Sequence, residues 1–240
     1  MFSEFKSYEA LLPTTAPASL EDLPLELQIY ADDKIEVWYS PMGAATEDPK
    51  IWILGITPGW NQMQIAYALA ADALKNGVRS NKAATMKKPA VAFAGSMRNN
   101  LVSMMDELGF ADILSVSTSA NLFGSEHLRT GSVLKYPVFS RGSNYAGHSP
   151  KPVSHPVLKE MVDVVLANEL KASEACMVLP LGKAVESVLQ YSTSKGLLDQ
   201  DRILSGFPHP SGANGHRRKQ FEQNKQSLQA QIGEWFGHGG

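Results

Sequence analysis

Two short loops carry the residues of this chain that are best suited to chemistry. The early loop is Gly55-Ile56-Thr57-Pro58-Gly59, and it directly follows the apolar run Ile51–Leu54. The late loop is His209-Pro210-Ser211-Gly212-Ala213-Asn214, and it directly follows the apolar run Ile203–Phe207. Turns that expose backbone N–H groups bind phosphates, which suits the late loop to a phosphate-bearing ligand. If both runs are strands of one α/β sheet, we expect the two loops to face a single cleft.

Several other chemistries find no support in the sequence. It contains neither a GxGxxG nor a GxxxxGK[ST] pattern, which argues against dinucleotide or ATP chemistry. It has no GxSxG elbow, and Ser211 lies only two residues from His209, a poor arrangement for a nucleophile and its base. The single cysteine, Cys176, lies in an apolar run and is interpreted as a core residue. No spacing of Cys or His predicts a metal site, and no cofactor is expected.

The form and order of the two loops resemble the active-site motifs of the uracil-DNA glycosylase superfamily. Further likeness lies in Phe93-Ala94-Gly95 and Leu181-Gly182-Lys183-Ala184 and extends over roughly residues 45–225. The resemblance implies one domain over residues 1–240, with an αβα three-layer fold around a mainly parallel four-stranded sheet. It also implies a monofunctional DNA glycosylase, a hydrolase that breaks the N-glycosidic bond of a flipped base and leaves an abasic site. DNA is then the partner, and uracil or a C5-modified pyrimidine the substrate.

The resemblance also assigns roles to individual residues. His209 would donate a hydrogen bond to the base oxygen that becomes negative as the bond breaks, while Thr57 would hold the attacking water. Phe93 would stack on the flipped base, and Asn121 would read its edge. The remaining base-binding residues would be Gly55, Ile56, Gly59 and Trp60. The residues expected to contact DNA are Ser211, Gly212, Ala213, Asn214, His216, Arg217 and Arg218.

Three positions depart from the family pattern. Thr57 stands where many relatives have an acid or an amide, and a threonine hydroxyl is a poor base at neutral pH. Gly59 replaces a tyrosine that crowds the C5 side of the base, so we expect open space there. Ala213 replaces a large apolar wedge. Thr57 and Gly59, together with an insert at 60–90 that is atypical of the family, favour a bulky C5-modified pyrimidine. Such bases occur in modified viral genomes, so antiviral defence is an alternative to DNA repair.

Other interpretations stay open for the same residues. Phe93 fits a core position, Asn121 fits a turn, and His209 fits a surface turn. For the whole chain, one alternative is a non-catalytic protein that binds DNA or a modified base on a glycosylase scaffold. Another is a nucleotide-binding α/β protein unrelated to DNA.

Strand and helix patterns alternate along the chain, which predicts an α/β fold with a parallel sheet. The segment 124–156 shows little periodicity and is expected to be a long loop. Strands are predicted at 34–40, 51–56, 112–116, 175–181 and 203–207. Helices are predicted at 61–76, 91–108, 157–170, 182–190 and 217–236.

The composition sets wider limits. The 240 residues are 43% hydrophobic, enough for one sizeable core, and the net charge of −2 excludes a uniformly basic coat but not a local basic patch. Residues 1–30 are expected to be an irregular lead-in, and 60–90 an insert atypical of the family. No signal pattern and no apolar run of about 18 residues is present, so we expect a cytoplasmic protein, without a membrane partner and monomeric.

Overall fold

The computed structural model describes residues 8–42, 48–77, 93 and 95–237. The chain forms two compact units that alternate along the sequence. Residues 78–90 of the expected insert lie outside the described residues. Unit 1 comprises Met1–Ala45, Ile56–Ala92 and Leu134–Leu166, and unit 2 comprises Thr46–Gly55, Phe93–Val133 and Ala167–Gly240.

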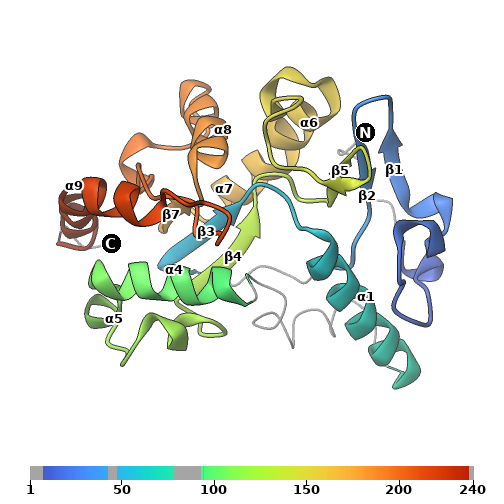
Figure 1. Cartoon of the computed structure of the whole chain (residues 1–240), viewed down its shortest axis with the longest axis horizontal. Coiled ribbons are helices and arrows are strands. Elements are labelled where there is room, and N and C mark those ends of the chain that lie inside the picture. The colour runs from blue at the N-terminus through green and yellow to red at the C-terminus, as the bar shows by residue number, and fades with distance from the viewer. Residues whose placement is uncertain (1–7, 43–47, 78–92, 94, 238–240) are drawn as a thin grey trace. The chain divides into compact units, whose positions relative to one another are not determined.

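Unit 1 contains a four-stranded antiparallel sheet in the order β1-β2-β5-β6 (Figure 1). Only β2 falls within a predicted strand, the one at 34–40. β1 begins inside the expected irregular lead-in. β5 and β6 lie inside the segment expected to be a loop. The strands are β1 (Gln28–Ala31), β2 (Glu36–Trp38), β5 (Val138–Ser140) and β6 (Ser143–Asn144).

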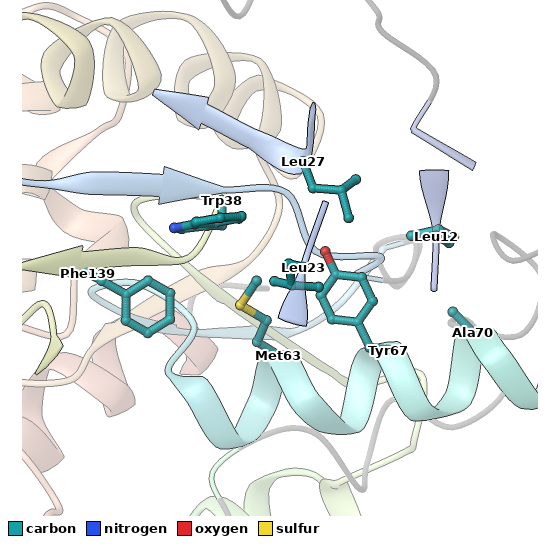
Figure 2. Packing of buried hydrophobic residues seen from close by; sticks show 8 residues of the cluster. All are labelled: Leu12, Leu23, Leu27, Trp38, Met63, Tyr67, Ala70 and Phe139. Carbon is teal, nitrogen blue, oxygen red and sulfur yellow. The ribbon is translucent and has the colours of Figure 1, made fainter. Parts of the chain in front are cut away.

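Helix α1 (Trp60–Lys75) provides one wall of the core of unit 1. Its side chains Met63, Tyr67 and Ala70 recur at helical spacing and belong to one buried cluster with the sheet residues Trp38 and Phe139 (Figure 2). The Tyr67 hydroxyl donates a 2.7 Å hydrogen bond to the carbonyl of Tyr39, which satisfies the polar end of a fully buried ring. The helix predicted at 61–76 is therefore confirmed. The other unit 1 helices are the short η1 (Glu9–Leu11), η2 (Leu20–Asp22), η3 (Leu25–Leu27) and η5 (Pro152–Ser154), then α6 (Pro156–Glu160) and the π-helical η6 (Met161–Leu166).

Unit 2 is built on a three-stranded parallel sheet in the order β4-β3-β7. The central strand β3 (Ile51–Gly55) is completely buried, and it pairs residue by residue with β4 (Leu128–Ser132), from Ile51 with Leu128 to Gly55 with Ser132. On its other side β3 pairs with β7 (Met177–Pro180). Unbroken apolar runs on both faces are typical of parallel strands covered by helices. The strands predicted at 51–56 and 175–181 are thus confirmed.

Helices complete unit 2. In Figure 1, α8 and α4 are drawn on opposite sides of the sheet. The long helices predicted from the C-terminal half, at 182–190 and 217–236, are present with nearly the expected limits. The helices are α4 (Ser96–Glu107), α5 (Phe110–Ile113), η4 (Ser119–Leu122), α7 (Ala167–Lys171), α8 (Lys183–Ser194), η7 (Gln200–Arg202) and α9 (Arg217–Gly237).

Three expectations about strands are wrong. Residues 112–116 form no strand, because the segment belongs to α5 and the turn after it. The expected loop 124–156 instead contains β4, β5 and β6. At 203–207 the chain makes only one parallel bridge, from Ile203 to Val178, before it turns away. Thus the sheet of unit 2 has three strands, where four were expected.

None of the helices in the described part of the chain combines the length and apolar character needed to cross a membrane.

Candidate functional site

The carboxyl edge of the unit 2 sheet brings together an aromatic ring and a hydroxyl. β3 ends at Gly55, which is paired with Ser132 at the end of β4. A β-carbon at Gly55 would lie 3.6 Å from Cε1 of Phe93 and 3.8 Å from Oγ of Ser132. Both side chains therefore border the same point of the sheet edge, and the glycine leaves that point unfilled.

Phe93 is held in a strained backbone conformation at this edge. Its φ is +48°, a region that non-glycine residues rarely adopt and that is concentrated at functional sites. Arg98 Nε donates a 2.9 Å hydrogen bond to the Phe93 carbonyl, which ties the residue to the first turn of α4. The ring is 8% exposed. The Phe93 ring thus lies beside Gly55, and most of its surface is already covered.

His209 lies beside the turn that follows β7. A β-carbon at Gly182 would lie 2.9 Å from Cβ of His209, so only glycine allows this close approach, and the φ of Gly182 is +86°. The backbone N–H of Ser211 donates a 3.2 Å hydrogen bond to Nδ1 of His209. Burial lowers the pKa of the imidazole below its ordinary value. A neutral ring that accepts at Nδ1 carries its proton on Nε2, so His209 is a hydrogen-bond donor at Nε2.

The late loop uses most of its own backbone N–H groups. Besides the Ser211 N–H, the Ala213 N–H donates to Ser211 Oγ, and the Asn214 N–H donates to the Ser211 carbonyl. The Gly212 N–H has no partner within the described residues, and Gly212 is exposed. Three of the loop N–H groups are thus already bonded within the loop, where broader phosphate binding by the loop amides was expected, and the Gly212 N–H is the exposed one that can reach a phosphate.

Helix α4 supports the late loop from one side. Asn100 Nδ2 donates a 2.9 Å hydrogen bond to the Pro210 carbonyl. A β-carbon at Gly212 would lie 3.7 Å from Oγ of Ser96, the first residue of α4. The N-terminus of α4 thus lies next to Gly212. Helix N-termini favour anions, which adds to the suitability of this corner for a phosphate.

Helix α9 supports the segment that leads into the late loop. Gln231 accepts from the Ser205 N–H and donates to the Ser205 carbonyl, at 2.8 and 3.2 Å. Asn224 Nδ2 donates a 2.7 Å bond to the carbonyl of Gly206, whose φ is +93°. These side chains also line an open cleft of about 900 Å³ next to α9. The glutamine-rich helix therefore fixes the chain three residues before His209.

The basic residues after the late loop have two different environments. Arg217 Nη1 donates a 2.8 Å bond to the Ser211 carbonyl, which places its guanidinium against the late loop. Arg218 instead pairs with both carboxylate oxygens of Glu107, at 2.5 and 3.0 Å, and with Glu222 at 2.7 Å. These arginine hydrogen bonds lower the pKa of the Glu107 carboxyl. Arg217 is thus available to a phosphate, whereas Arg218 is neutralised.

The other residues expected to contact DNA differ in exposure. Ala213 and His216 are exposed, and Asn214 is half-buried.

The early loop beyond Gly55 belongs to unit 1, where Thr57 is engaged with the backbone. Thr57 Oγ1 donates a 2.9 Å hydrogen bond to the Tyr136 carbonyl and accepts a 3.0 Å bond from the Val138 N–H. The hydroxyl proton is committed, and one lone pair remains. Thr57 can therefore accept a hydrogen bond from water, and its visible role is to fasten the early loop to the start of β5.

The space beside Gly59 contains another side chain. A β-carbon at Gly59 would lie 3.3 Å from Nδ2 of Asn144, and Asn144 Oδ1 accepts a 2.8 Å bond from the Trp60 N–H at the start of α1. Where open space was expected, an exposed amide thus borders the early loop.

The other two residues expected to bind the base, Trp60 and Ile56, have partners in unit 1. The Trp60 ring packs edge-on against Phe139, with 6.4 Å between centroids. The Ile56 carbonyl accepts a backbone hydrogen bond from the Leu134 N–H.

The structure places Asn121 differently from the sequence prediction. It lies in η4, ahead of the amino end of β4, where Ser117 Oγ donates a 3.3 Å hydrogen bond to its Oδ1. The residue at the carboxyl end of the strand next to β3 is Ser132. Sequence reasoning missed Ser132 because it missed β4.

Metal coordination has no obvious place in this geometry. Across the described ranges, no three side chains of His, Cys, Asp or Glu gather as a metal site requires.

Comparison with known proteins identifies a relative of nearly the same length. The chain is 37% identical over 233 residues to a Bacillus subtilis (strain 168) protein whose name is Uncharacterized protein YoxB. The match covers 95% of this chain and 91% of YoxB. The chain belongs to the YoxB family. No family model and no solved structure matches it.

Proposed function

We propose that this protein is a monofunctional DNA glycosylase and a divergent member of the uracil-DNA glycosylase superfamily. The observation that carries the proposal is the buried His209, whose Nδ1 accepts the Ser211 N–H and leaves Nε2 as the donor, in the same unit as Phe93. A preorganised donor aimed at a leaving group that gains negative charge is worth about 10²–10³ in rate.

In this reaction the bond between C1′ of the deoxyribose and a ring nitrogen of the base breaks. The base departs with the bonding electrons, and its negative charge spreads onto an exocyclic carbonyl oxygen next to that nitrogen. His209 Nε2–H donates a hydrogen bond to that oxygen, while a water oxygen bonds to C1′ and its proton passes to solvent. The products are a free base and an abasic site. No lysine is assigned as a nucleophile, so the DNA strand stays intact.

The late loop and α4 supply contacts to the DNA backbone. Three groups around one corner can contact a phosphate: the Gly212 N–H, the Ser211 hydroxyl and the Arg217 guanidinium. Their contacts with a phosphate do not depend on which base is present. Such contacts set the position of the protein on the strand, while the base pocket selects the base. Extrusion of the base costs a few kcal/mol, which these phosphate contacts offset.

The fold is consistent with this proposal. The parallel bridge from Ile203 to Val178 continues the β4-β3-β7 sheet by one pairing, in the position of a fourth strand. Helices drawn on both sides of the sheet agree with the three layers expected of the superfamily (Figure 1). We infer that a single irregular residue pairing takes the place of a full edge strand in this family.

The experiment is an excision assay on labelled single- and double-stranded DNA. The DNA carries uracil, 5-hydroxymethylcytosine, glucosylated cytosine or unmodified cytosine, and alkali reveals abasic sites. We expect excision of one modified base or of uracil and a loss of about 10²–10³ in rate for His209→Ala. His127→Ala, which changes a histidine outside the site, is the matched control. Full activity of His209→Ala would overturn the proposed role.

One observation favours a second function. The Thr57 hydroxyl is bound at both Tyr136 and Val138, so no general base is assigned to activate water. On this alternative the protein binds a modified base in DNA without excising it. Salt-sensitive DNA binding, without abasic product from any base in the panel, would establish the alternative.

A further inference from the structure

The carboxyl end of β4 presents the hydroxyl of Ser132 next to the Phe93 ring. Ser132 is half-buried, and its Oγ has no hydrogen-bond partner within the described residues. It lies 3.8 Å from the point where a Gly55 side chain would begin, and the Phe93 ring lies 3.6 Å from that same point. An unpaired hydroxyl at the margin of an aromatic ring is suited to the polar edge of a planar ring stacked there.

The local structure directs Ser132 towards Phe93. Its neighbour Gly131 lies on the opposite face of the strand, where a β-carbon would be 2.9 Å from Nε1 of Trp52. Trp52 is stacked against Arg129, whose guanidinium carbon is 3.8 Å from the ring centroid. Because side chains alternate along a strand, this packing fixes Ser132 on the face of Gly55 and Phe93.

We propose that Ser132 is the specificity-determining residue that reads the edge of the flipped base, in the role that the sequence assigned to Asn121. This inference rests on the proposed function. A serine hydroxyl both donates and accepts, so it can pair with an exocyclic carbonyl oxygen or with an exocyclic amino group. The base class it admits therefore includes 4-keto pyrimidines such as uracil and 4-amino pyrimidines such as 5-hydroxymethylcytosine.

The test compares Ser132→Ala with Asn121→Ala on base-containing DNA and on DNA with a tetrahydrofuran abasic analogue. Loss of one neutral hydrogen bond predicts a roughly three- to tenfold fall in kcat/KM for Ser132→Ala on an accepted base. Binding of the tetrahydrofuran DNA should be unchanged, because no base edge is present. Ser132→Thr, which keeps the hydroxyl, should retain activity, and Ser187→Ala removes an exposed hydroxyl on α8 as a matched control.

Each outcome decides the inference. A fall in kcat/KM for Asn121→Ala with no change in kcat/KM for Ser132→Ala would overturn the inference and restore the assignment made from sequence. If Ser132→Ala weakened binding to base-containing DNA and to tetrahydrofuran DNA equally, the inference would also be overturned, because the effect would then be structural. If the wild-type protein excises no base, the proposed function fails. In that case the DNA affinities test the role of Ser132. Ser132→Ala should weaken binding to base-containing DNA and leave binding to tetrahydrofuran DNA unchanged.

Discussion

His209 is held as a hydrogen-bond donor by its own loop. The Ser211 N–H occupies Nδ1, so protonation of the ring would set two N–H groups against each other. Burial lowers the imidazole pKa, which means that the neutral form is favoured in the folded protein. The stabilising contribution of His209 is therefore complete above the unfolded pKa of about 6.5 and is lost as pH falls through the folded value.

This linkage predicts a titration shift. In an NMR titration of the histidine ring resonances, His209 should titrate below about 6.5, the value of an unperturbed imidazole. Ser211→Pro, which removes the N–H donor, should move the titration midpoint upwards because Nδ1 becomes free to bind a proton. A midpoint for wild-type His209 above 6.5 would contradict the assignment of a neutral donor.

Thr57 gives a second prediction at this scale. Thr57→Val keeps the shape of the side chain but removes the hydrogen bonds of its hydroxyl to the Tyr136 carbonyl and the Val138 N–H. Such a loss costs about 1–3 kcal/mol in the free energy of unfolding. Thr57→Ser keeps the hydroxyl and should retain most of that stability. Urea unfolding measures both variants, and equal stability of Thr57→Val and wild type would contradict the fastening role of the hydroxyl.

At the scale of elements, two neighbouring arginines at the start of α9, Arg217 and Arg218, have different environments although both were expected to contact DNA. Arg217→Ala should weaken DNA binding and reduce the salt dependence by about one phosphate contact. Arg218→Ala should leave DNA binding nearly unchanged, because Glu107 and Glu222 already pair with this guanidinium. Binding titrations over a range of salt concentrations test the pair, and a larger loss for Arg218→Ala would reverse the assignment.

The elements also show what sequence patterns could and could not predict. β3 and α1 were predictable because a wholly apolar run and a helical repeat are strong signals. β4 was not, because its residues Arg129, Gly131 and Ser132 look polar. In the fold, Arg129 is buried against Trp52 and pairs with Glu169 at 2.6 Å. These contacts are long-range in sequence, so no local sequence pattern predicts them. Missing this strand moved the expected base-reading residue to Asn121.

The candidate site was predictable in part for the same reason. His209 and Phe93 follow from local motifs, and both lie in unit 2 beside the sheet edge. The partners of Thr57 and of Gly59 come from β5 and β6 or the chain just before them, about 80 residues away. Those two environments are formed by loops and short strands that meet only in the folded chain, so no local pattern predicts that Asn144 borders Gly59.

For the whole molecule, the interleaving of the units constrains how the protein unfolds. Three segments of each unit alternate along the chain, so the chain passes between the units five times. If one unit unfolded alone, its middle segments would remain as loops closed at both ends by the other unit. Such closed loops gain less conformational entropy than free chain ends, which disfavours separate unfolding.

We therefore expect one cooperative unfolding transition, and the four tryptophans report it from both units. Trp38 and Trp60 lie in unit 1, and Trp52 and Trp235 lie in unit 2. With 5-fluorotryptophan incorporated, all four native ¹⁹F resonances should disappear at the same urea concentration. Single Trp→Phe variants assign the resonances. Two separate midpoints, with Trp38 and Trp60 together and Trp52 and Trp235 together, would show instead that each unit folds independently despite its three discontinuous segments.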